Sequence, residues 1–268
     1  MTQAIVYPPR WIRTLQRYRQ LVTVFKGWPK FLATKWGWKK DNLELETRSG
    51  LKLIVPDQAR FEFKDVFLHR AYGFRPLLQQ LPPEPVVLDV GANVGFFSLF
   101  AFQCRPGSFC LAFEPLPANF RVLKHHQELN PTRRWQVFQQ AVMARDGEVE
   151  ICSQKNNQVD ASARITTAGL PAAPGGRQPQ KVLARSLPSI FAAHRLSRCH
   201  WLKLDCEGSE YEILYQCPAD TLRQIEAISL EIHHRDEQSG NQRALCAYLE
   251  GHGFRLFAAD DAVVHALR

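Results

Sequence analysis

The stretch VLDVGANVG, residues Val87–Gly95, decides the fold of this chain. A short apolar run ends in Asp89, the glycines Gly91 and Gly95 follow, and an apolar helical pattern begins at Phe96. Glycines at a strand-to-helix turn let the backbone approach a ligand closely. The helix N-terminus behind them favours an anionic group such as a carboxylate. Because open α/β sheets carry their ligand crevice at such turns, we predict a ligand loop here.

The sequence around this loop alternates short apolar runs with helical patterns, which is typical of parallel βαβ units. We therefore predict an α/β fold built on a parallel sheet. The expected core strands are Val86–Val90, Phe109–Phe113, Gln136–Ala141, His200–Leu204 and Ile228–Ile232. The expected helices include Ala118–Leu129, Leu187–Ala193 and Glu210–Tyr215. The chain is expected to close with a helix at Gln242–Glu250 and strands at Phe254–Ala258 and Ala262–Ala266.

An insertion follows the third expected strand. Residues Glu148–Ser153 and Lys181–Ala184 predict an inserted strand pair. The polar stretch Gln154–Gln180 between them is long for a plain connection, so it is either mobile or a lid over the site.

Residues 1–84 are expected to form a basic appendage to a catalytic domain at 85–268. Apolar residues recur at helical steps between Trp11 and Phe25, which predicts an amphipathic helix. The alternation and the turn within Leu43–Val55 predict a β-hairpin, and Phe61–Leu81 has a helical pattern.

The charge of the chain is concentrated in this appendage. The net charge is +8, yet residues 1–40 hold nine Lys or Arg and no Asp or Glu, so the remainder is close to neutral. Two interpretations of the amphipathic helix stay open. Its stripe packs on the catalytic domain or on a second subunit, or the basic helix rests on an anionic membrane surface or holds an anionic substrate. The stripe consists of Trp11, Leu15, Tyr18, Val22 and Phe25.

The composition is that of a globular protein, with 45% hydrophobic and 22% charged residues. No apolar run approaches the roughly 18 residues of a spanning helix, and the N-terminal sequence lacks the pattern of a secretory signal. The seven cysteines include no CxxC pair, which favours free thiols in a reducing compartment. We therefore expect a cytoplasmic protein. Its basic helix would also allow peripheral contact with the inner face of the membrane.

The glycine loop and a later acid together predict an adenosine site. The loop reads GxxxG, whereas the pyrophosphate of NAD normally requires GxGxxG. Glu114 ends the second expected strand, 25 residues beyond Asp89, where a carboxylate accepts hydrogen bonds from both ribose hydroxyls. Because NAD also contains a ribose, Glu114 indicates an adenosine site but does not distinguish NAD from another adenosine-containing cofactor.

A second group of ionisable residues follows two later strands. Lys203 and Asp205 share one face of their strand, and Glu207 follows at the turn into the next helix. Glu231 and His233 share one face of the next strand. Central parallel strands are normally apolar, so these groups either pair as a structural ion network or serve a site at the same crevice.

Five stretches resemble, in order and spacing, the motifs of the FkbM family of methyltransferases. The resemblance covers roughly Val86 to Arg235, and its specific part is the KxDxEGxE pattern with ExH following. It implies a Rossmann-like class I sheet with an antiparallel C-terminal strand, S-adenosylmethionine as methyl donor, and usually methylation of a hydroxyl. The stretches are VLDVGANVGFFSL, AFEPLPANFRVL, QQAVMARDGEVEI, WLKLDCEGSEYEIL and ISLEIHH.

The resemblance also assigns residues to the cofactor. Glu114 would hold the ribose, and Ala141 would lie near the adenine, although the usual polar partner of the adenine amine is not evident there. The methionine end would be held by the loop residues Asp89, Gly91, Ala92, Asn93 and Gly95.

An alcohol acceptor has to lose a proton, so a base is expected beside the methyl group. His233 is the first candidate because its ordinary pKa lies near 6.5, and Asp205 is the second. Glu207 and Lys203 would bind the acceptor or fix Asp205. These side chains could also ligate a metal, but they show no fixed metal-ligand spacing, so we predict none.

The predicted function is therefore O-methylation of a hydroxyl on a sugar, glycolipid or natural product. An NAD-dependent oxidoreductase and a non-catalytic, membrane-associated binding protein with this fold are the alternatives. Nucleic acid is an unexpected substrate, because the catalytic half is near neutral and has no NPPY-like motif that would stack a flipped base.

Overall fold

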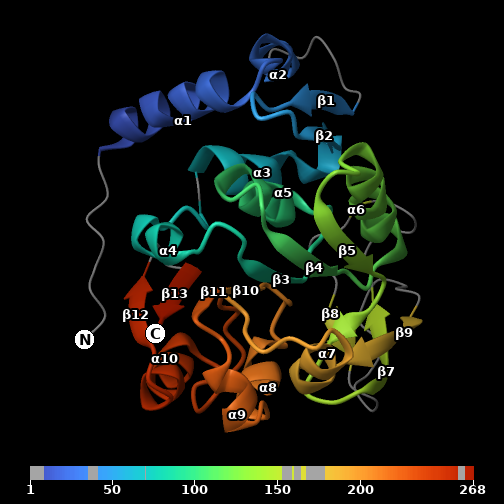
Figure 1. Cartoon of the computed structure of the whole chain (residues 1–268), viewed down its shortest axis with the longest axis vertical. Helices are drawn as coiled ribbons and strands as arrows, with labels where there is room; N and C mark the ends of the chain where they lie inside the picture. Colours follow the sequence, from blue (N-terminus) through green and yellow to red (C-terminus); the bar gives the residue numbers. More distant parts are fainter. Residues whose placement is uncertain are drawn as a thin grey trace.

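A seven-stranded sheet runs through the centre of the chain (Figure 1). The computed structural model describes residues 9–35, 42–69, 71–152, 159, 164–166, 179–258 and 263–268. The strand order is β12-β13-β11-β10-β3-β4-β5; β13 pairs antiparallel with both β12 and β11, and the other neighbouring strands pair in parallel. This confirms the mostly parallel α/β sheet with an antiparallel C-terminal strand. The bounds are β3 Val86–Val90, β4 Phe109–Phe113, β5 Arg134–Phe138, β10 Trp201–Leu204, β11 Ala227–Glu231, β12 Arg255–Ala258 and β13 Val263–Leu267.

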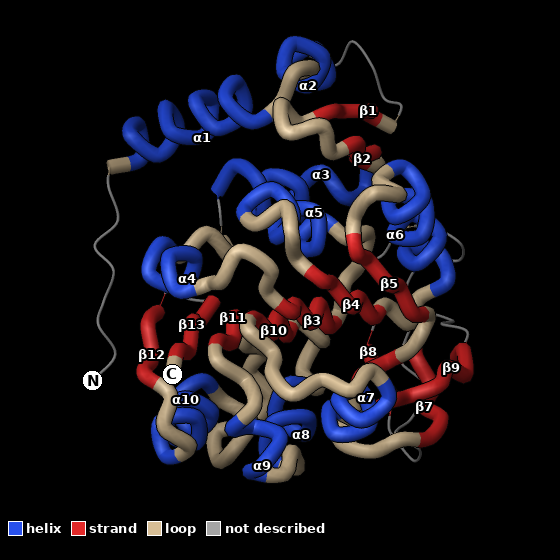
Figure 2. Tube along the Cα trace, viewed as in Figure 1, coloured by secondary structure: helices blue, strands red, loops and turns tan. Residues whose placement is uncertain are grey.

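Helices cover both faces of this sheet (Figure 2). The central strands are buried on both sides, which explains why they read as continuous apolar runs. One face carries α4 Arg75–Gln80, α5 Phe96–Cys104 and α6 Pro117–Leu129. The other face carries α7 Leu187–Ala193, α8 Glu210–Tyr215, α9 Ala219–Arg223 and α10 Gln242–Gly251.

Most predicted boundaries agree with the structure to within two residues, with two exceptions. The segment Phe61–Leu81 is not one helix, because Phe74 is extended and Pro76 starts a new helix, α4. The third core strand ends at Phe138, and Ala141 belongs to a separate short strand. The N-terminal part of the broken segment lies in α3 Arg60–Phe63 and the π-helix η2 Lys64–His69, which follow the short helix η1 Asp57–Ala59.

The insertion forms a second sheet with the order β6-β9-β7-β8. The predicted strand pair is present as β7 and β9, which run antiparallel. Of the stretch expected to be mobile or a lid, only residue 159, β8 and the first residues of β9 are described, so that prediction falls outside the described residues. The bounds are β6 Ala141–Val142, β7 Gly147–Cys152, β8 Arg164–Thr166 and β9 Pro179–Arg185.

The N-terminal residues form a layer over α5 (Figure 1). This layer comprises the described part of residues 9–74, with the elements α1 Arg10–Val24, α2 Trp28–Lys35, the expected hairpin β1 Leu43–Glu46 and β2 Lys52–Val55, η1, α3 and η2. Phe63 is fully buried between Phe25 of this layer and Phe96 of α5. The centre of its ring lies 5.4 Å from that of Phe25 and 5.7 Å from that of Phe96. The appendage and the face of the sheet that carries α5 therefore share one hydrophobic core.

The amphipathic helix α1 turns most of its predicted stripe toward solvent. Trp11 is 65% exposed and Leu15 is 60% exposed, while Val22 is also on the surface. Of the stripe residues, only Phe25 is buried, and Leu21 joins it in the core. The interpretation in which the whole stripe packs on the catalytic domain is thus wrong, since α1 is anchored at its C-terminal end. Among the described residues, no helix has the length and apolarity that crossing a membrane requires.

Candidate active site

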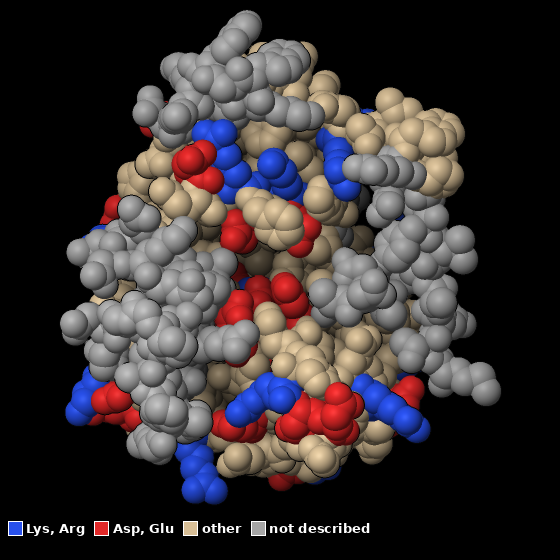
Figure 3. Space-filling view, turned by 180° about the vertical axis from the view of Figure 1, so that it is seen from behind, with Lys and Arg blue, Asp and Glu red and all other residues tan. Residues whose placement is uncertain are grey.

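A cavity of about 290 Å³ opens at the carboxyl ends of β3, β4, β10 and β11. Figure 3 shows acidic side chains gathered around a hollow on this face of the molecule. The ends of the four strands and the segments that follow them form most of the wall, and residues of the N-terminal layer and of the inserted sheet form the rest. The charged residues that line the cavity are all acidic: Glu62, Asp65, Glu114, Asp205, Glu207 and Glu231.

The glycine loop lies against the end of the neighbouring strand. Gly91 has a φ of +72°, and a Cβ at this position would lie 1.8 Å from the backbone oxygen of Asp205. The backbone N–H groups of Gly91 and Ala92 both donate to the carbonyl of Phe113. Gly91 lines the cavity, whereas Ala92 and Gly95 do not. These two residues therefore shape the loop from behind.

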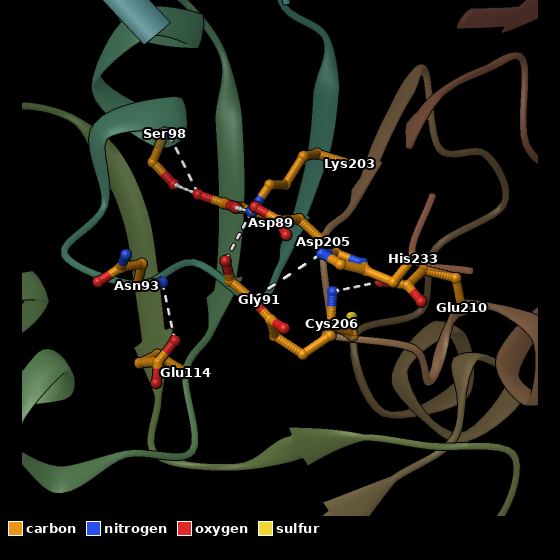
Figure 4. Close-up of polar contacts among 11 residues, drawn as sticks. Asp89, Gly91, Asn93, Ser98, Glu114, Lys203, Asp205, Cys206, Glu210 and His233 are labelled. Carbon is orange, nitrogen blue, oxygen red and sulfur yellow. Dashed lines mark hydrogen bonds and ion pairs between the residues drawn. The ribbon is translucent and has the colours of Figure 1, made fainter. Parts of the chain in front are cut away.

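Asp89 is fully buried and does not line the cavity. Its Oδ2 accepts hydrogen bonds from the hydroxyl of Ser98, at 2.6 Å, and from the backbone N–H of Ser98 (Figure 4). Its Oδ1 lies 3.6 Å from Nζ of Lys203. Burial raises the pKa of Asp89, against the lowering effect of Lys203 and Ser98. Asp89 thus connects the end of β3 to α5, and it does not line the cavity.

Lys203 connects the two predicted groups of residues. Its Nζ donates to the carbonyl of Gly91 at 2.6 Å and lies 3.3 Å from Oδ2 of Asp205 (Figure 4). Burial alone lowers the pKa of Lys203, but the carboxylates of Asp205 and Asp89 outweigh this effect and raise it. A buried cation thereby holds the glycine loop and the end of β10 side by side.

Glu114 lines the cavity at the place expected for a ribose acceptor. Its Oε2 accepts from the N–H of Asn93 at 2.8 Å, and its Oε1 accepts from the N–H of Leu116 at 2.9 Å. Burial nevertheless raises the pKa of Glu114 to about 7. Asn93 has a φ of +51°, and its side-chain Oδ1 is buried without a hydrogen-bond partner among the described residues.

His233 stands behind the cavity wall between two carboxylates. Its Nδ1 lies 3.1 Å from Oε1 of Glu210, and its Nε2 lies 3.8 Å from Oε1 of Glu207, which lines the cavity. Burial alone lowers the pKa of His233, but its hydrogen bond to Glu210 and the charges of Glu210 and Glu207 outweigh burial and raise the pKa. The pKa of His233 therefore lies above the ordinary value near 6.5 on which its choice as the base rested, because two acids stabilise the protonated ring.

The remaining predicted residues lie at the cavity. Asp205 and Ala141 line it, and burial raises the pKa of Glu231, which lines it as well. The structure thus brings together the ends of β3, β4, β10 and β11, as the sequence predicted for the two groups of ionisable residues.

Sequence reasoning missed one wall and one buried acid. Phe61, Glu62 and Tyr72 of the N-terminal layer line the cavity, and no motif in that region identifies them. Glu210, with 0% of its side chain exposed, accepts from the N–H of Cys206 and holds His233. A signal for Glu210 was present, because it stands within the KxDxEGxE pattern.

The cavity fits the adenosyl cofactor that the resemblance implies. At one end, the buried Oδ1 of Asn93 lacks a partner and can accept a hydrogen bond from an ammonium group. In the middle, Glu114 offers a carboxylate to a diol. At the other end, the walls are apolar and suit a flat base, with Phe113, Leu116, Ala141, Val142 and Ile151.

A family model that matches more than half of the chain identifies its family. Residues 89–256 match the Methyltransferase FkbM domain. The chain is 27% identical over 242 residues to the 31-O-demethyl-FK506 methyltransferase FkbM of Streptomyces tacrolimicus, covering 82% of this chain and 91% of the relative. It is 25% identical over 221 residues to the methyltransferase sdnD of Sordaria araneosa, covering 74% of this chain and 82% of the relative.

A solved structure carries the same family name. The crystal structure of the methyltransferase FkbM from Methylobacillus flagellatus KT aligns with a TM-score of 0.47 and 13% identity. The alignment covers 79% of this chain and 54% of that chain, so this chain spans about half of its length.

Proposed function

Because the chain belongs to the FkbM methyltransferase family, we propose that it methylates a hydroxyl of a small molecule, such as a sugar, a glycolipid or a natural product, with S-adenosylmethionine as donor. The family match carries this proposal, and the cavity between the glycine loop and the ends of β10 and β11 supports it. The same match counts against the NAD-dependent alternative.

In this proposal the residues of β3 and β4 hold the donor. When bound, S-adenosylmethionine supplies an electrophilic methyl group on a positively charged sulfur. The backbone of Gly91 and the side chain of Asn93 face its amino-acid end, and Glu114 accepts hydrogen bonds from the ribose hydroxyls. Asp89 acts as a positioning residue, since its contacts to Ser98 and Lys203 fix the loop.

The acidic wall serves the acceptor. Asp205 and Glu207 line the cavity, so either carboxylate can receive the proton that an acceptor hydroxyl loses. Lys203 fixes Asp205, and His233 stands behind Glu207 as its charge partner. Holding the reacting atoms in line contributes up to about 7–11 kcal/mol to catalysis of this kind. A positioned base contributes roughly 10²- to 10⁴-fold in addition.

The exposed stripe of α1 favours a second role for the N-terminal layer, namely contact with an anionic membrane. Trp11 and Leu15 lie on the surface of a helix whose segment, residues 1–40, carries only basic charges. Such helices lie in the lipid interface with their aromatic side chains inserted.

A donor-binding and transfer experiment tests the proposal. Thermal shift and calorimetry compare S-adenosylhomocysteine with NAD, and we expect only the former to bind. A panel of hydroxyl compounds incubated with methyl-labelled donor should yield a product that is one methyl group heavier. Asp205→Asn should slow turnover by about 10²- to 10⁴-fold with S-adenosylhomocysteine binding retained. Binding of NAD alone would refute the proposal, and vesicle binding without donor binding would favour the non-catalytic alternative.

A further inference from the structure

The side chains that line the cavity near His233, together with those directly behind this wall, carry more negative than positive charge. Lys203 and His233 are the basic side chains of this group among the described residues, and each already contacts two carboxylates. A bound donor adds one net positive charge, which leaves carboxylates in excess. Because buried carboxylates without a countercharge are unfavourable, the wall favours a further cation. The carboxylates belong to Asp89, Asp205, Glu207, Glu210 and Glu231.

Two of these carboxylates and His233 lie close enough together to share one metal ion. One oxygen of Asp205, one oxygen of Glu231 and one ring nitrogen of His233 lie within 4.8 Å of one another. They come from the ends of the adjacent parallel strands β10 and β11, at the mouth of the cavity. Carboxylate oxygens with one imidazole nitrogen suit Mg²⁺ or Mn²⁺ better than softer metals.

A second, independent feature is the buried carboxylate behind the histidine. The side chain of Glu210 is fully buried, and its Oε1 lies 3.1 Å from Nδ1 of His233. Its other oxygen, Oε2, has no hydrogen-bond partner among the described residues. Since Nδ1 is occupied, Nε2, which lies 3.8 Å from Oε1 of Glu207, is the ring nitrogen that remains for a ligand, and a cation there would take the place of the Nε2 proton. A histidine that donates its other ring N–H to a carboxylate is the usual arrangement of a metal ligand.

We propose that Asp205, Glu231 and His233 bind one divalent cation of the Mg²⁺ or Mn²⁺ class, with Glu210 as the positioning residue of His233. This inference rests on the proposed function and specifies how the acceptor is activated. A cation at this place polarises the acceptor hydroxyl and lowers its pKa. The O–H bond then breaks, its electron pair stays on oxygen, and the proton goes to the carboxylate of Glu207, which faces the same space.

Metal binding to the full chain tests this site directly. The chain is titrated with Mn²⁺ in the presence of S-adenosylhomocysteine, and free Mn²⁺ is followed by electron paramagnetic resonance. We expect one Mn²⁺ per chain. Asp205→Asn should abolish this binding, and Glu210→Gln should weaken it by about 10- to 100-fold. Glu212→Gln is the matched control, because this exposed acid on the same helix contacts Arg235 and should leave the Mn²⁺ affinity unchanged.

Binding of S-adenosylhomocysteine to each variant separates the outcomes. Retained S-adenosylhomocysteine binding without Mn²⁺ binding to the wild-type chain would overturn the metal site and leave the methyltransferase proposal standing. Mn²⁺ affinity that survives both Asp205→Asn and Glu210→Gln would overturn it as well. If the wild-type chain binds neither probe, the proposed function fails together with the inference. Should Glu210→Gln unfold, Asp205→Asn decides alone, since Asp205 lies in a partly exposed loop.

Discussion

At the scale of single residues, the close approach of Gly91 to Asp205 decides whether the glycine loop forms. Gly91→Ala should abolish S-adenosylhomocysteine binding, because its Cβ would lie 1.8 Å from the Asp205 carbonyl oxygen. The positive φ adds about 1–2 kcal/mol of strain, and overpacking adds about 1–3 kcal/mol. Calorimetry and denaturant unfolding measure both effects.

Gly50 provides the matched control for this substitution. It has a φ of +85°, yet no atom lies within 4 Å of the position of an added Cβ. Gly50→Ala should therefore lower the free energy of unfolding by about 1–2 kcal/mol and leave S-adenosylhomocysteine affinity unchanged. Equal effects of the two substitutions on binding would contradict a specific contact at Gly91.

The raised pKa of Glu114 predicts a pH dependence of donor binding. Ribose hydroxyls donate to the ionised carboxylate, so protonation competes with binding. Since burial raises the pKa of Glu114 to about 7, affinity for S-adenosylhomocysteine should be full above this pH and fall below it. The dissociation constant should rise by up to about tenfold per pH unit. Calorimetry in steps of about half a pH unit, between about pH 5.5 and 8.5, measures this slope.

Glu114→Gln tests the origin of that slope. The amide keeps the size of the side chain but does not ionise in this range. The variant should bind S-adenosylhomocysteine more weakly at high pH and show a flat profile. A pH dependence that persists in Glu114→Gln would assign the titration to another group.

At the scale of elements, the exposed stripe of α1 predicts binding to anionic vesicles. Trp11→Ala combined with Leu15→Ala should weaken sedimentation with phosphatidylserine vesicles by at least about tenfold, because two large apolar side chains no longer insert. Gln16→Ala on the same helix is the control, since it changes an exposed polar residue. Equal sedimentation of the double variant and the wild type would exclude the stripe as the membrane contact.

At the scale of the whole molecule, the shared core predicts that the N-terminal layer and the sheet unfold together. Phe63 is fully buried between Phe25 and Phe96, so Phe63→Ala should lower the free energy of unfolding by about 3–5 kcal/mol. Calorimetry should show a single transition at a lower temperature. Two transitions, of which only one moves, would instead support a separate domain at residues 1–84.

Phe61→Ala is the companion variant. Phe61 is 69% exposed and stands two residues from Phe63, at the rim of the cavity. Its removal should change the free energy of unfolding by no more than about 0.5 kcal/mol. A large loss of stability in Phe61→Ala would mean that the segment, and not the buried ring, is the sensitive feature.

The local sequence by itself determined the central sheet and the glycine loop. Strands β3 and β4 are five-residue segments that are almost entirely apolar, with Asp89 as the exception, and their predicted bounds agree with the structure. The edge strand β5 is partly exposed, so its apolar pattern is weaker and its predicted end was wrong. Asp89, Gly91 and Glu114 were found because each stands at a strand end, a position that a short motif encodes.

Only the tertiary structure decided the contacts that join distant segments. Lys203 donates to Gly91 across 112 positions of the chain, and residues of the N-terminal layer form one wall of the cavity. The raised pKa of His233 likewise depends on Glu210, a side chain 23 positions away. A local pattern indicates which face of a helix or strand is buried, but tertiary packing determines which other segment lies against that face. Which charges meet in the cavity therefore follows from the folded chain alone.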